Sequence, residues 1–315
     1  MSPLEAGDKL DHYRLDERVA DGGMATIFRA TDLRDQTQVA IKVPKPEAEC
    51  DPSSFARFQR EAEIGRMMDH PGVLRVFPAE KSRRVYFVME WVAGVSLRAL
   101  LTRDQPMDPE RAIRIATAVC DVLDHIHARG VVHRDLKPEN IIVGNGDQIK
   151  LIDFGIAGMA DARRLTYGKF SQSFGTPDYV APEQVKGKRG DARTDIYSLG
   201  VILYEMLTGA MPFEGETPLV VLNSRLKNDA ISPRKRNPNL SPELQQVILR
   251  ALEREPDRRY ANAKELEQDL LSPPPLRRRE RAQSPAPRGS LLLYSGLAAI
   301  PILIGALLLY VAAHQ

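Results

Sequence analysis

The chain has 315 residues, of which 43% are hydrophobic, and this is enough for a full hydrophobic core. Because residues 272–290 carry five arginines and one glutamate, residues 1–271 keep 39 basic and 41 acidic residues, and this net charge of −2 excludes the electrostatic footprint of a nucleic-acid-binding domain. Cys50 and Cys120 lack the spacing of a metal site or a disulfide framework, which fits a reducing compartment.

Short β-branched runs in the first 92 residues predict strands. A turn containing Gly22 and Gly23 precedes the run Val39-Ala40-Ile41, which ends in Lys42. Glycine permits positive φ angles and lets backbone amides approach a phosphate closely. A lysine at a strand end is by itself most often solvated, so this one needs a partner to indicate function. Residues 1–14 contain no apolar run, so no signal peptide is expected.

Residues 55–69 predict an amphipathic helix. The helix carries Glu61, whereas Glu63 lies about 200° further around it and cannot share that face. The plain interpretation of Glu61 is a surface charge, and the functional one is an ion pair with Lys42. The apolar run 86–92 follows and predicts a strand that crosses the core.

The most informative stretch is VVHRDLKPENIIVGNGDQIKLIDFG, residues 131–155. Two short β-branched runs joined by an Asn-Gly-Asp turn predict a hairpin. The hairpin would bring Asn140 and Asp153 to one end, where both could reach a single metal ion. Together with Asp135 and Lys137 they supply the groups needed to hold magnesium, a nucleoside triphosphate and an accepting hydroxyl.

HRDLKPEN, followed 13 residues after Asn140 by Asp153-Phe154-Gly155, resembles the eukaryotic-type (Hanks-type) serine/threonine protein kinases. The run Val39-Ala40-Ile41-Lys42 and the helical Glu61 fit the same family. A Gly-Gly-Met turn followed by Phe28-Arg29-Ala30 resembles its bacterial members. The resemblance covers about residues 13–271, so it implies a protein kinase domain over that range.

The resemblance also implies a role for each residue of the set. Asp135 would orient the accepting hydroxyl and take its proton, and Lys137 would offset charge on the γ-phosphoryl group. Asn140 and Asp153 would hold Mg²⁺, or Mn²⁺ in its place. Lys42, aimed by the helical glutamate, would grip the α- and β-phosphates of ATP.

Further residues would line the nucleotide pocket. The implied adenine contacts are the gatekeeper Met89, the Glu90 carbonyl, the Val92 amide and, on the two faces of the ring, Ala40 and Ile142. The glycine turn adds Ala20, Gly22, Gly23 and Ile27. Of the three family glycines only Gly22 is kept. An alanine where φ must be positive costs about 1 kcal/mol, so Ala20 predicts weaker ATP binding.

The segment after Gly155 has the length of an activation loop and ends at Ala181-Pro182-Glu183, which fits the family's APE motif. Thr176 would hydrogen-bond Asp135 and Lys137, as in kinases that act on serine or threonine. The candidate phosphosites are Thr166, Ser171 and Ser173, although ordinary loop hydroxyls are the plainer interpretation of any one. Arg134, Arg163, Arg164 and Lys169 form a basic cluster that a phosphate would relieve.

The C-terminal part predicts mainly helices, over residues 108–129, 195–208, 241–253 and 261–271. The resemblance implies that Asp195 anchors the backbone of the catalytic loop and that Arg259 pairs with Glu183. Ser241-Pro242-Glu243 has the N-cap, proline and acid that begin a helix. Cys120 lies in an apolar helical run and is expected in the core.

Gly65, four residues after Glu61, stands where family members usually carry a larger side chain. That side chain would pack beside Val76, His133 and Phe154. We therefore expect a gap at this point and a loosely held helix. On this hypothesis Gly65→Leu would raise the basal activity.

Residues 272–290 are rich in proline and arginine and predict an extended linker. Residues 291–313 run 23 residues without a charge. At 1.5 Å per residue they would reach about 34 Å, enough for a bilayer core of about 30 Å, so one transmembrane helix is expected. A buried core helix is the alternative. The flanking arginines predict a cytoplasmic kinase domain, tail-anchored in a bacterial inner membrane because only two residues follow.

The predicted fold is α+β and protein-kinase-like: an antiparallel-sheet N-lobe at about residues 13–92, a mainly helical C-lobe at about residues 93–271, and the transmembrane helix. The predicted function is ATP-dependent phosphorylation of protein serine and threonine at the membrane, with autophosphorylation. The alternatives are a pseudokinase scaffold, favoured by the altered glycine turn, and a small-molecule kinase, disfavoured by the APE segment. Expected partners are ATP, protein substrates and membrane lipid. Dimerisation, the substrate and the activating signal are left open.

Overall fold

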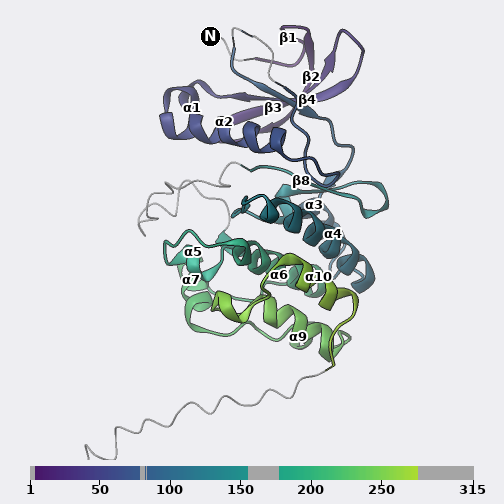
Figure 1. Ribbon diagram of the computed structural model, residues 1–315, viewed down its shortest axis with the longest axis vertical. Coiled ribbons are helices and arrows are strands. Elements are labelled where there is room, and N and C mark those ends of the chain that lie inside the picture. The colour runs from purple at the N-terminus through teal and green to yellow at the C-terminus, as the bar shows by residue number, and fades with distance from the viewer. Residues whose placement is uncertain (1–3, 79–81, 83, 155–176, 276–315) are drawn as a thin grey trace, which may run out of the picture. The chain divides into compact units, whose positions relative to one another are not determined.

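The structure is a computed structural model that describes residues 4–78, 82, 84–154 and 177–275. Its first sheet is antiparallel, with the strand order β1-β2-β3-β4-β5 (Figure 1). The strands are β1 (Lys9–Leu10), β2 (Tyr13–Asp21), β3 (Ala25–Asp32), β4 (Gln38–Pro44) and β5 (Phe87–Glu90). This sheet is the predicted N-lobe, and its antiparallel arrangement is confirmed.

Two helices, α1 (Pro46–Cys50) and α2 (Pro52–Met67), follow β4. The carboxylate of Asp51 caps α2 by accepting a hydrogen bond from the Ser54 amide at 2.8 Å. Phe58 packs its ring 4.9 Å from that of Phe87 on β5. Ile64 and Met68, at the other end, belong to the apolar core of the helical part. The helix that carries Glu61 is therefore fixed to both hydrophobic cores.

A second, smaller sheet has the order β6-β7-β8. Its strands are β6 (Val95–Ser96), β7 (Ile141–Val143) and β8 (Ile149–Leu151). β7 and β8 form the predicted hairpin, with Asn145–Asp147 as a 3₁₀ turn between them. The β7–β8 hairpin therefore follows the segment that carries Asp135, Lys137 and Asn140, and it precedes Asp153.

The rest of the described chain is mainly helical. Its helices are α3 (Leu97–Arg103), α4 (Pro109–Ala128), α5 (Pro182–Val185), α6 (Ala192–Thr208), α7 (Pro218–Lys227), α8 (Pro233–Arg236), α9 (Pro242–Ala251) and α10 (Ala263–Leu271). All residues of α6 from Thr194 to Leu207 are buried, and α4, α9 and α10 pack against it. The helix ends at Gly209, whose φ of 67° favours glycine. α6 is thus the centre of the helical core.

The five predicted helices occur as α2, α4, α6, α9 and α10, with ends shifted by a few residues. Ser241 caps α9 as predicted, accepting a hydrogen bond from the Leu244 amide at 3.0 Å. Cys120 is buried in the core and Cys50 is exposed, and both are free thiols. Over the described ranges, none of the helices is long and apolar enough to cross a membrane. The span expected at 291–313 lies outside those ranges.

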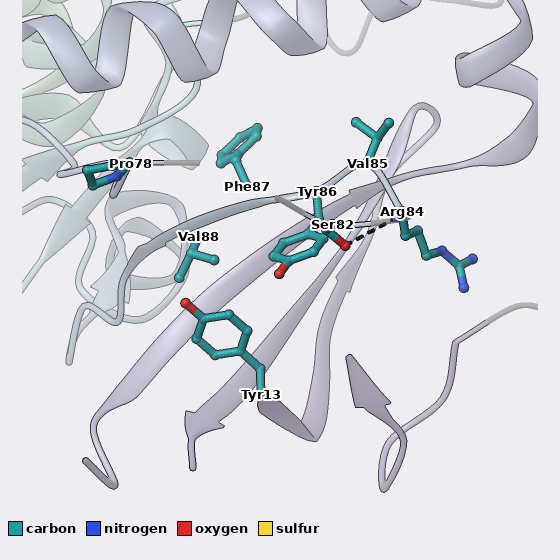
Figure 2. A pocket seen from close by; sticks show the side chains of 8 residues that line it. All are labelled: Tyr13, Pro78, Ser82, Arg84, Val85, Tyr86, Phe87 and Val88. Atoms are coloured by element: carbon teal, nitrogen blue, oxygen red, sulfur yellow. Dashed lines mark hydrogen bonds between the residues drawn. The ribbon is translucent and has the colours of Figure 1, made fainter. Parts of the chain in front are cut away.

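A small cavity lies at the β5 edge of the first sheet, beside Tyr13 of β2 (Figure 2). It is lined by Tyr13, Pro78, Ser82, Arg84, Val85, Tyr86, Phe87 and Val88. The hydroxyl of Tyr86 donates a hydrogen bond to Asp11 at 2.7 Å. None of the predicted catalytic, nucleotide-binding or metal-binding residues lines this cavity.

Candidate active site

Lys42 on β4 and Glu61 on α2 form the ion pair expected from the sequence. The ammonium Nζ lies 2.6 Å from both carboxylate oxygens, and the side chains are only 15% and 10% exposed. Burial raises the pKa of Glu61, and the nearby charge of Asp153 adds to that rise. Burial alone would lower the pKa of Lys42, but Glu61 and Asp153 together raise it. The lysine therefore stays charged, paired with Glu61 and favoured by the charge of Asp153. Glu63 is exposed on the other face of α2.

The catalytic segment brings Asp135, Lys137 and Asn140 together. The Lys137 ammonium lies 2.7 Å from the Asp135 carboxylate. The Asn140 side-chain amide donates to the Asp135 carbonyl at 2.9 Å and, more weakly, to its carboxylate at 3.4 Å. These contacts fix the amide nitrogen of Asn140 toward Asp135 and leave its oxygen available as a metal ligand.

Asp195 holds this segment from α6, as predicted. Its carboxylate accepts hydrogen bonds of 2.8 Å from the backbone amides of His133 and Arg134, and one of 2.7 Å from His127. Burial alone would raise the pKa of Asp195, but the His127 bond and the other contacts hold it below its usual range. Arg134 has a φ of 63°, an uncommon left-handed conformation. The buried carboxylate thus fixes a strained backbone immediately before Asp135.

Asp153 lies beside the catalytic segment because the amide of Ile152 donates to the Asn140 carbonyl at 2.9 Å. Asp153 has a φ of 66°. The next residue, Phe154, is buried, and its ring lies 5.2 Å from that of His133. The hairpin therefore brings Asn140 and Asp153 to the same end, and the charge of Asp153 also acts on Lys42.

The predicted adenine contacts lie largely in one apolar cluster. Ala40 and Met89 are buried neighbours on β4 and β5, and Ile27 and Val92 pack against their cluster. Ile142 lies on β7, opposite Lys150 of β8. The structure therefore brings three predicted adenine contacts, Ala40, Met89 and Val92, together with Ile27 of the glycine turn, and it places Ile142 on the other sheet.

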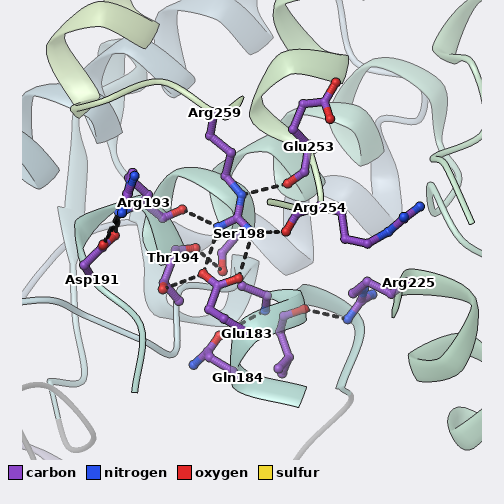
Figure 3. A network of polar contacts seen from close by, with 12 residues as sticks. Glu183, Gln184, Asp191, Arg193, Thr194, Ser198, Arg225, Glu253, Arg254 and Arg259 are labelled. Atoms are coloured by element: carbon purple, nitrogen blue, oxygen red, sulfur yellow. Dashed lines mark hydrogen bonds and ion pairs between the residues drawn. The ribbon is translucent and has the colours of Figure 1, made fainter. Parts of the chain in front are cut away.

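A second buried ion pair joins Glu183 to Arg259 in the helical part (Figure 3). The two guanidinium nitrogens Nη1 and Nη2 lie 2.8 and 2.7 Å from the carboxylate oxygens. Thr194 donates a further hydrogen bond of 2.8 Å to Glu183. Burial would raise the pKa of Glu183, but the bonds from Arg259 outweigh it and lower that pKa. The predicted pairing is present and fixes the end of the APE segment.

Three features of this site occur together in one known family. They are the Lys42–Glu61 pair, the anchored segment of Asp135 and the ion pair between the APE glutamate and Arg259. A family model for the protein kinase domain covers residues 13–271. The chain belongs to the protein kinase family. The two-lobed kinase fold predicted from the sequence is therefore confirmed.

Its similar relatives are bacterial. The serine/threonine-protein kinase PknB of Mycolicibacterium smegmatis is 39% identical over 266 residues, which cover 83% of this chain and 43% of that relative. The serine/threonine-protein kinase pkn3 of Myxococcus xanthus is 36% identical over 301 residues, which cover 92% of this chain and 54% of that relative. The chain thus spans about half the length of these relatives or less. The Mycobacterium tuberculosis PknI kinase domain matches with a TM-score of 0.65 and 25% identity, covering 86% of this chain and all of that one.

The glycine-rich turn of this kinase differs from the expectation. Ala20 lies in β2, paired with Ile27 of β3, and its φ is not positive. Gly22 and Gly23 also lack positive φ angles, and the Gly22 amide donates to the Ala25 carbonyl at 3.0 Å. The predicted strain at Ala20 was wrong, because the residue is an ordinary strand member. Asp21 beside it bonds Lys45 and Arg18, which lower its pKa to about 2.

The gap predicted beside Gly65 was also wrong. A Cβ atom at this position would lie 2.3 Å from the Cγ2 atom of Val76. Val76 forms a bridge with Met89 of β5 and so reaches Gly65 from a different segment. The glycine therefore allows α2 to approach Val76 closely, and Gly65→Leu is no longer expected to raise activity.

Two polar clusters near the site were not predicted from the sequence. The side chain of Glu90 binds the Lys150 ammonium at 2.5 Å and accepts from the Arg75 amide at 2.8 Å, which ties the end of β5 to β8. Arg98 on α3 bridges two glutamates and a tyrosine near the catalytic segment. Both clusters join residues that are far apart in the sequence, and no sequence motif indicates these contacts.

Several predicted residues lie outside the described ranges. These are Gly155, Thr166, Ser171, Ser173 and Thr176, with Arg163, Arg164 and Lys169 of the predicted basic cluster. Arg134, the described member of that cluster, has its pKa lowered by burial and by the nearby charge of Arg189.

Proposed function

We propose that this chain is an ATP-dependent serine/threonine protein kinase. The observation that carries the proposal is the closed Lys42–Glu61 pair, 2.6 Å long, in the same molecule as the anchored Asp135–Lys137–Asn140 set. Phosphoryl transfer requires mainly that the protein position the reactants and stabilise their charge, and these residues are suited to both tasks. The bacterial relatives named above are serine/threonine-protein kinases, which supports the same substrate class.

Each side chain has a distinct task in this proposal. Asp135 orients the substrate hydroxyl and receives its proton as the phosphorus–oxygen bond forms. Lys137, 2.7 Å from Asp135, offsets negative charge on the transferred group. Lys42 holds the α- and β-phosphates of ATP, while Glu61 keeps its ammonium charged and aimed.

The nucleotide pocket is proposed to take ATP as its substrate. The apolar cluster of Ala40, Met89, Ile27 and Val92 would cover the adenine ring, with Ile142 on its other face. The backbone of Glu90 and Val92 would bind the adenine edge. The turn with Ala20, Gly22 and Gly23 would lie over the phosphates. Because Ala20 is unstrained in β2, it gives no reason for weakened ATP binding.

A magnesium ion fits the donor set. Mg²⁺ is usually held by one or two protein oxygens together with substrate phosphates and water, rather than by a full protein cage. Asn140 has its amide nitrogen directed to Asp135, which leaves an oxygen donor, and Asp153 supplies a carboxylate. These two residues would hold the ion, whose charge would offset that of the phosphates; Mn²⁺ would suit the same oxygen donors.

Autophosphorylation in the segment between Asp153 and Glu183 forms part of the proposal. Arg134 Nη1 is buried and, among the described residues, has no hydrogen-bond partner. A phosphate on Thr166, Ser171 or Ser173 would supply acceptor oxygens and negative charge.

We further propose that residues 291–313 anchor the kinase domain on the cytoplasmic side of a membrane. Support comes from 23 uncharged residues in a row and from five arginines in the preceding linker. Those arginines would also be attracted to anionic headgroups by about 1 kcal/mol each. Fractionation of the full chain is the test: it should need detergent for release, and release by high salt alone would contradict the span.

The competing function is a pseudokinase scaffold. The intact catalytic residues and the unstrained glycine-rich turn both weigh against it. Purified chain should be incubated with γ-labelled ATP and a panel of proteins, and the label should appear on serine and threonine. Nucleotide binding without any label on the chain or on the panel would favour the scaffold, and label on a metabolite alone would favour a small-molecule kinase.

A further inference from the structure

The guanidinium group of Arg98 joins four separate elements. Its Nε lies 2.9 Å from Glu139 of the 3₁₀ turn Pro138–Asn140, and its Nη1 lies 2.7 Å from Glu205 of α6. Its Nη2 donates to the hydroxyl of Tyr179 in the 3₁₀ turn Pro177–Tyr179. Tyr179 in turn donates to Glu205. One arginine from α3 thus holds two carboxylates and a phenol together.

The cluster lies beside the catalytic segment, because Glu139 belongs to the 3₁₀ turn that ends at Asn140. Glu139 is the neighbour of Asn140 and follows Asp135 by four residues. Tyr179 belongs to the stretch that leads into the APE motif. On the proposed function, a peptide that presents its hydroxyl to Asp135 would lie across the surface between these two segments. Glu139 is 45% exposed and Arg98 33% exposed, so the cluster opens to solvent on one side.

Two carboxylates with a phenol form a binding site for a guanidinium or ammonium group. Carboxylates bind guanidinium strongly through charge-assisted hydrogen bonds in a forked geometry. Glu205 is only 8% exposed, so it would be an especially strong partner for an incoming base. In this molecule Arg98 already occupies that site. Burial alone would lower the pKa of Arg98, but the bonds to Glu205, Tyr179 and Glu139 raise it.

We propose that Arg98 fills, from within the protein, a subsite that would otherwise select an arginine or lysine of the substrate. Resting on the kinase function proposed above, this assigns the substrate class: proteins with a neutral or acidic residue at the position that meets Glu139. A basic residue there would meet the positive charge of Arg98 and find Glu205 already paired, so it gains nothing. Specificity arises here from an internal competitor rather than from a new attraction.

The test is a positional-scanning peptide library phosphorylated by the full chain and by Arg98→Leu. For each protein, the rate with arginine at each position is divided by its own rate with alanine there. The wild type should give a ratio near or below one at the position that meets this cluster. Arg98→Leu should gain about a tenfold arginine preference at one position, which corresponds to about 1.4 kcal/mol. Arg103→Leu, in the exposed last turn of the same helix, is the matched control and should keep the wild-type ratios.

Because Arg98→Leu leaves Glu205 buried without its cation, Arg98→Leu/Glu205→Gln provides a second variant that removes this charge. Glu139 remains in it, so a smaller arginine preference of about threefold should appear at the same position. The proposal is overturned if a folded variant without Arg98 keeps flat arginine ratios, or if the wild type already prefers arginine at that position. An inactive wild type would instead refute the kinase function, so the two failures are distinguishable.

Discussion

The two buried ion pairs, Lys42–Glu61 in the N-lobe and Glu183–Arg259 in the C-lobe, have similar chemistry and different surroundings. Arg259 uses all five of its N–H donors: two bond Glu183 and the others bond the carbonyls of Glu253, Arg193 and Arg254. Its guanidinium also lies 4.8 Å from the ring of Tyr197. Lys42 directs two hydrogen bonds to one partner, Glu61.

The same kind of interaction serves two purposes in the two lobes. The pKa of Glu183 is lowered, so its charged form is well satisfied and the pair is a permanent part of the fold. The pKa of Glu61 is raised by burial and by Asp153, so its charged form is held at a cost. Within the described residues, the Lys42–Glu61 pair therefore has fewer compensating contacts than the Glu183–Arg259 pair.

Removing the cation should mainly lower the stability in one pair and mainly lower the activity in the other, and this is the largest expected difference. Arg259→Met leaves Glu183 buried and unpaired, so the free energy of unfolding should fall by about 3–5 kcal/mol. Lys42→Met should lower phosphoryl transfer by at least about 100-fold, because the lysine is proposed to hold the phosphates. Its effect on unfolding should stay below about 2 kcal/mol, since Glu61 can accept a proton instead.

Chemical denaturation and transfer assays on the same preparations measure this contrast. A Lys42→Met protein that loses as much stability as Arg259→Met would show that both pairs are structural. A folded Lys42→Met protein with wild-type transfer would remove Lys42 from the site.

The close contact at Gly65 brings α2, which carries Glu61, against Val76. Gly65→Leu should lower the free energy of unfolding by about 1–3 kcal/mol, because even its Cβ would lie 2.3 Å from Val76. Displacement of α2 should also weaken the Lys42–Glu61 pair and reduce transfer. Gly65→Ala/Val76→Ala, which removes the obstructing methyl groups, should recover part of the loss relative to Gly65→Ala. Increased activity in Gly65→Leu would restore the gap hypothesis.

The two glutamates should also separate in their response to pH. Since the pKa of Glu61 is raised, its carboxylate should take up a proton on acidification while the pH is still above the ordinary carboxyl pKa of about 4.3. The folded state binds this proton more tightly than the unfolded state, so protonation of Glu61 adds to the stability of the fold. Since the pKa of Glu183 is lowered, its contribution is present above that value and is lost only as pH falls below it. ATP affinity of the wild type relative to Glu61→Gln should therefore fall before the melting temperature does. Parallel affinity profiles in the two proteins would contradict this.

The smallest expected effect is at Ala20. Because this residue lies in β2, Ala20→Gly should leave the KM for ATP within about twofold and cost at most about 1 kcal/mol of stability. Steady-state kinetics at varied ATP gives the comparison. A several-fold lower KM would show that the turn needs glycine after all.

The sequence sufficed for the residues that lie within motifs. Asp135, Lys137 and Asn140 are close in the chain, so their spacing alone predicts that they meet. The pairs Lys42–Glu61 and Glu183–Arg259 needed the family resemblance, because their members come from different elements.

What could not be predicted depends on tertiary packing. Val76 reaches Gly65 from another segment, and the strand register that places Ala20 opposite Ile27 is not visible in the glycine pattern. Arg98 meets Glu139 and Glu205 only after α3 and α6 have packed. Short helices such as α1 and α3 are also weak sequence signals, because packing rather than propensity stabilises them.

Asp135 is proposed as the group that serves the transition state of phosphoryl transfer. Single-turnover transfer from γ-labelled ATP to a serine or threonine substrate, measured at saturating ATP, tests this directly. Asp135→Asn should reduce the rate constant by orders of magnitude while the Kd for ATP stays nearly unchanged, because the carboxylate contributes mainly in the transition state. A rate constant near that of the wild type, from a folded and ATP-bound variant, would contradict the account.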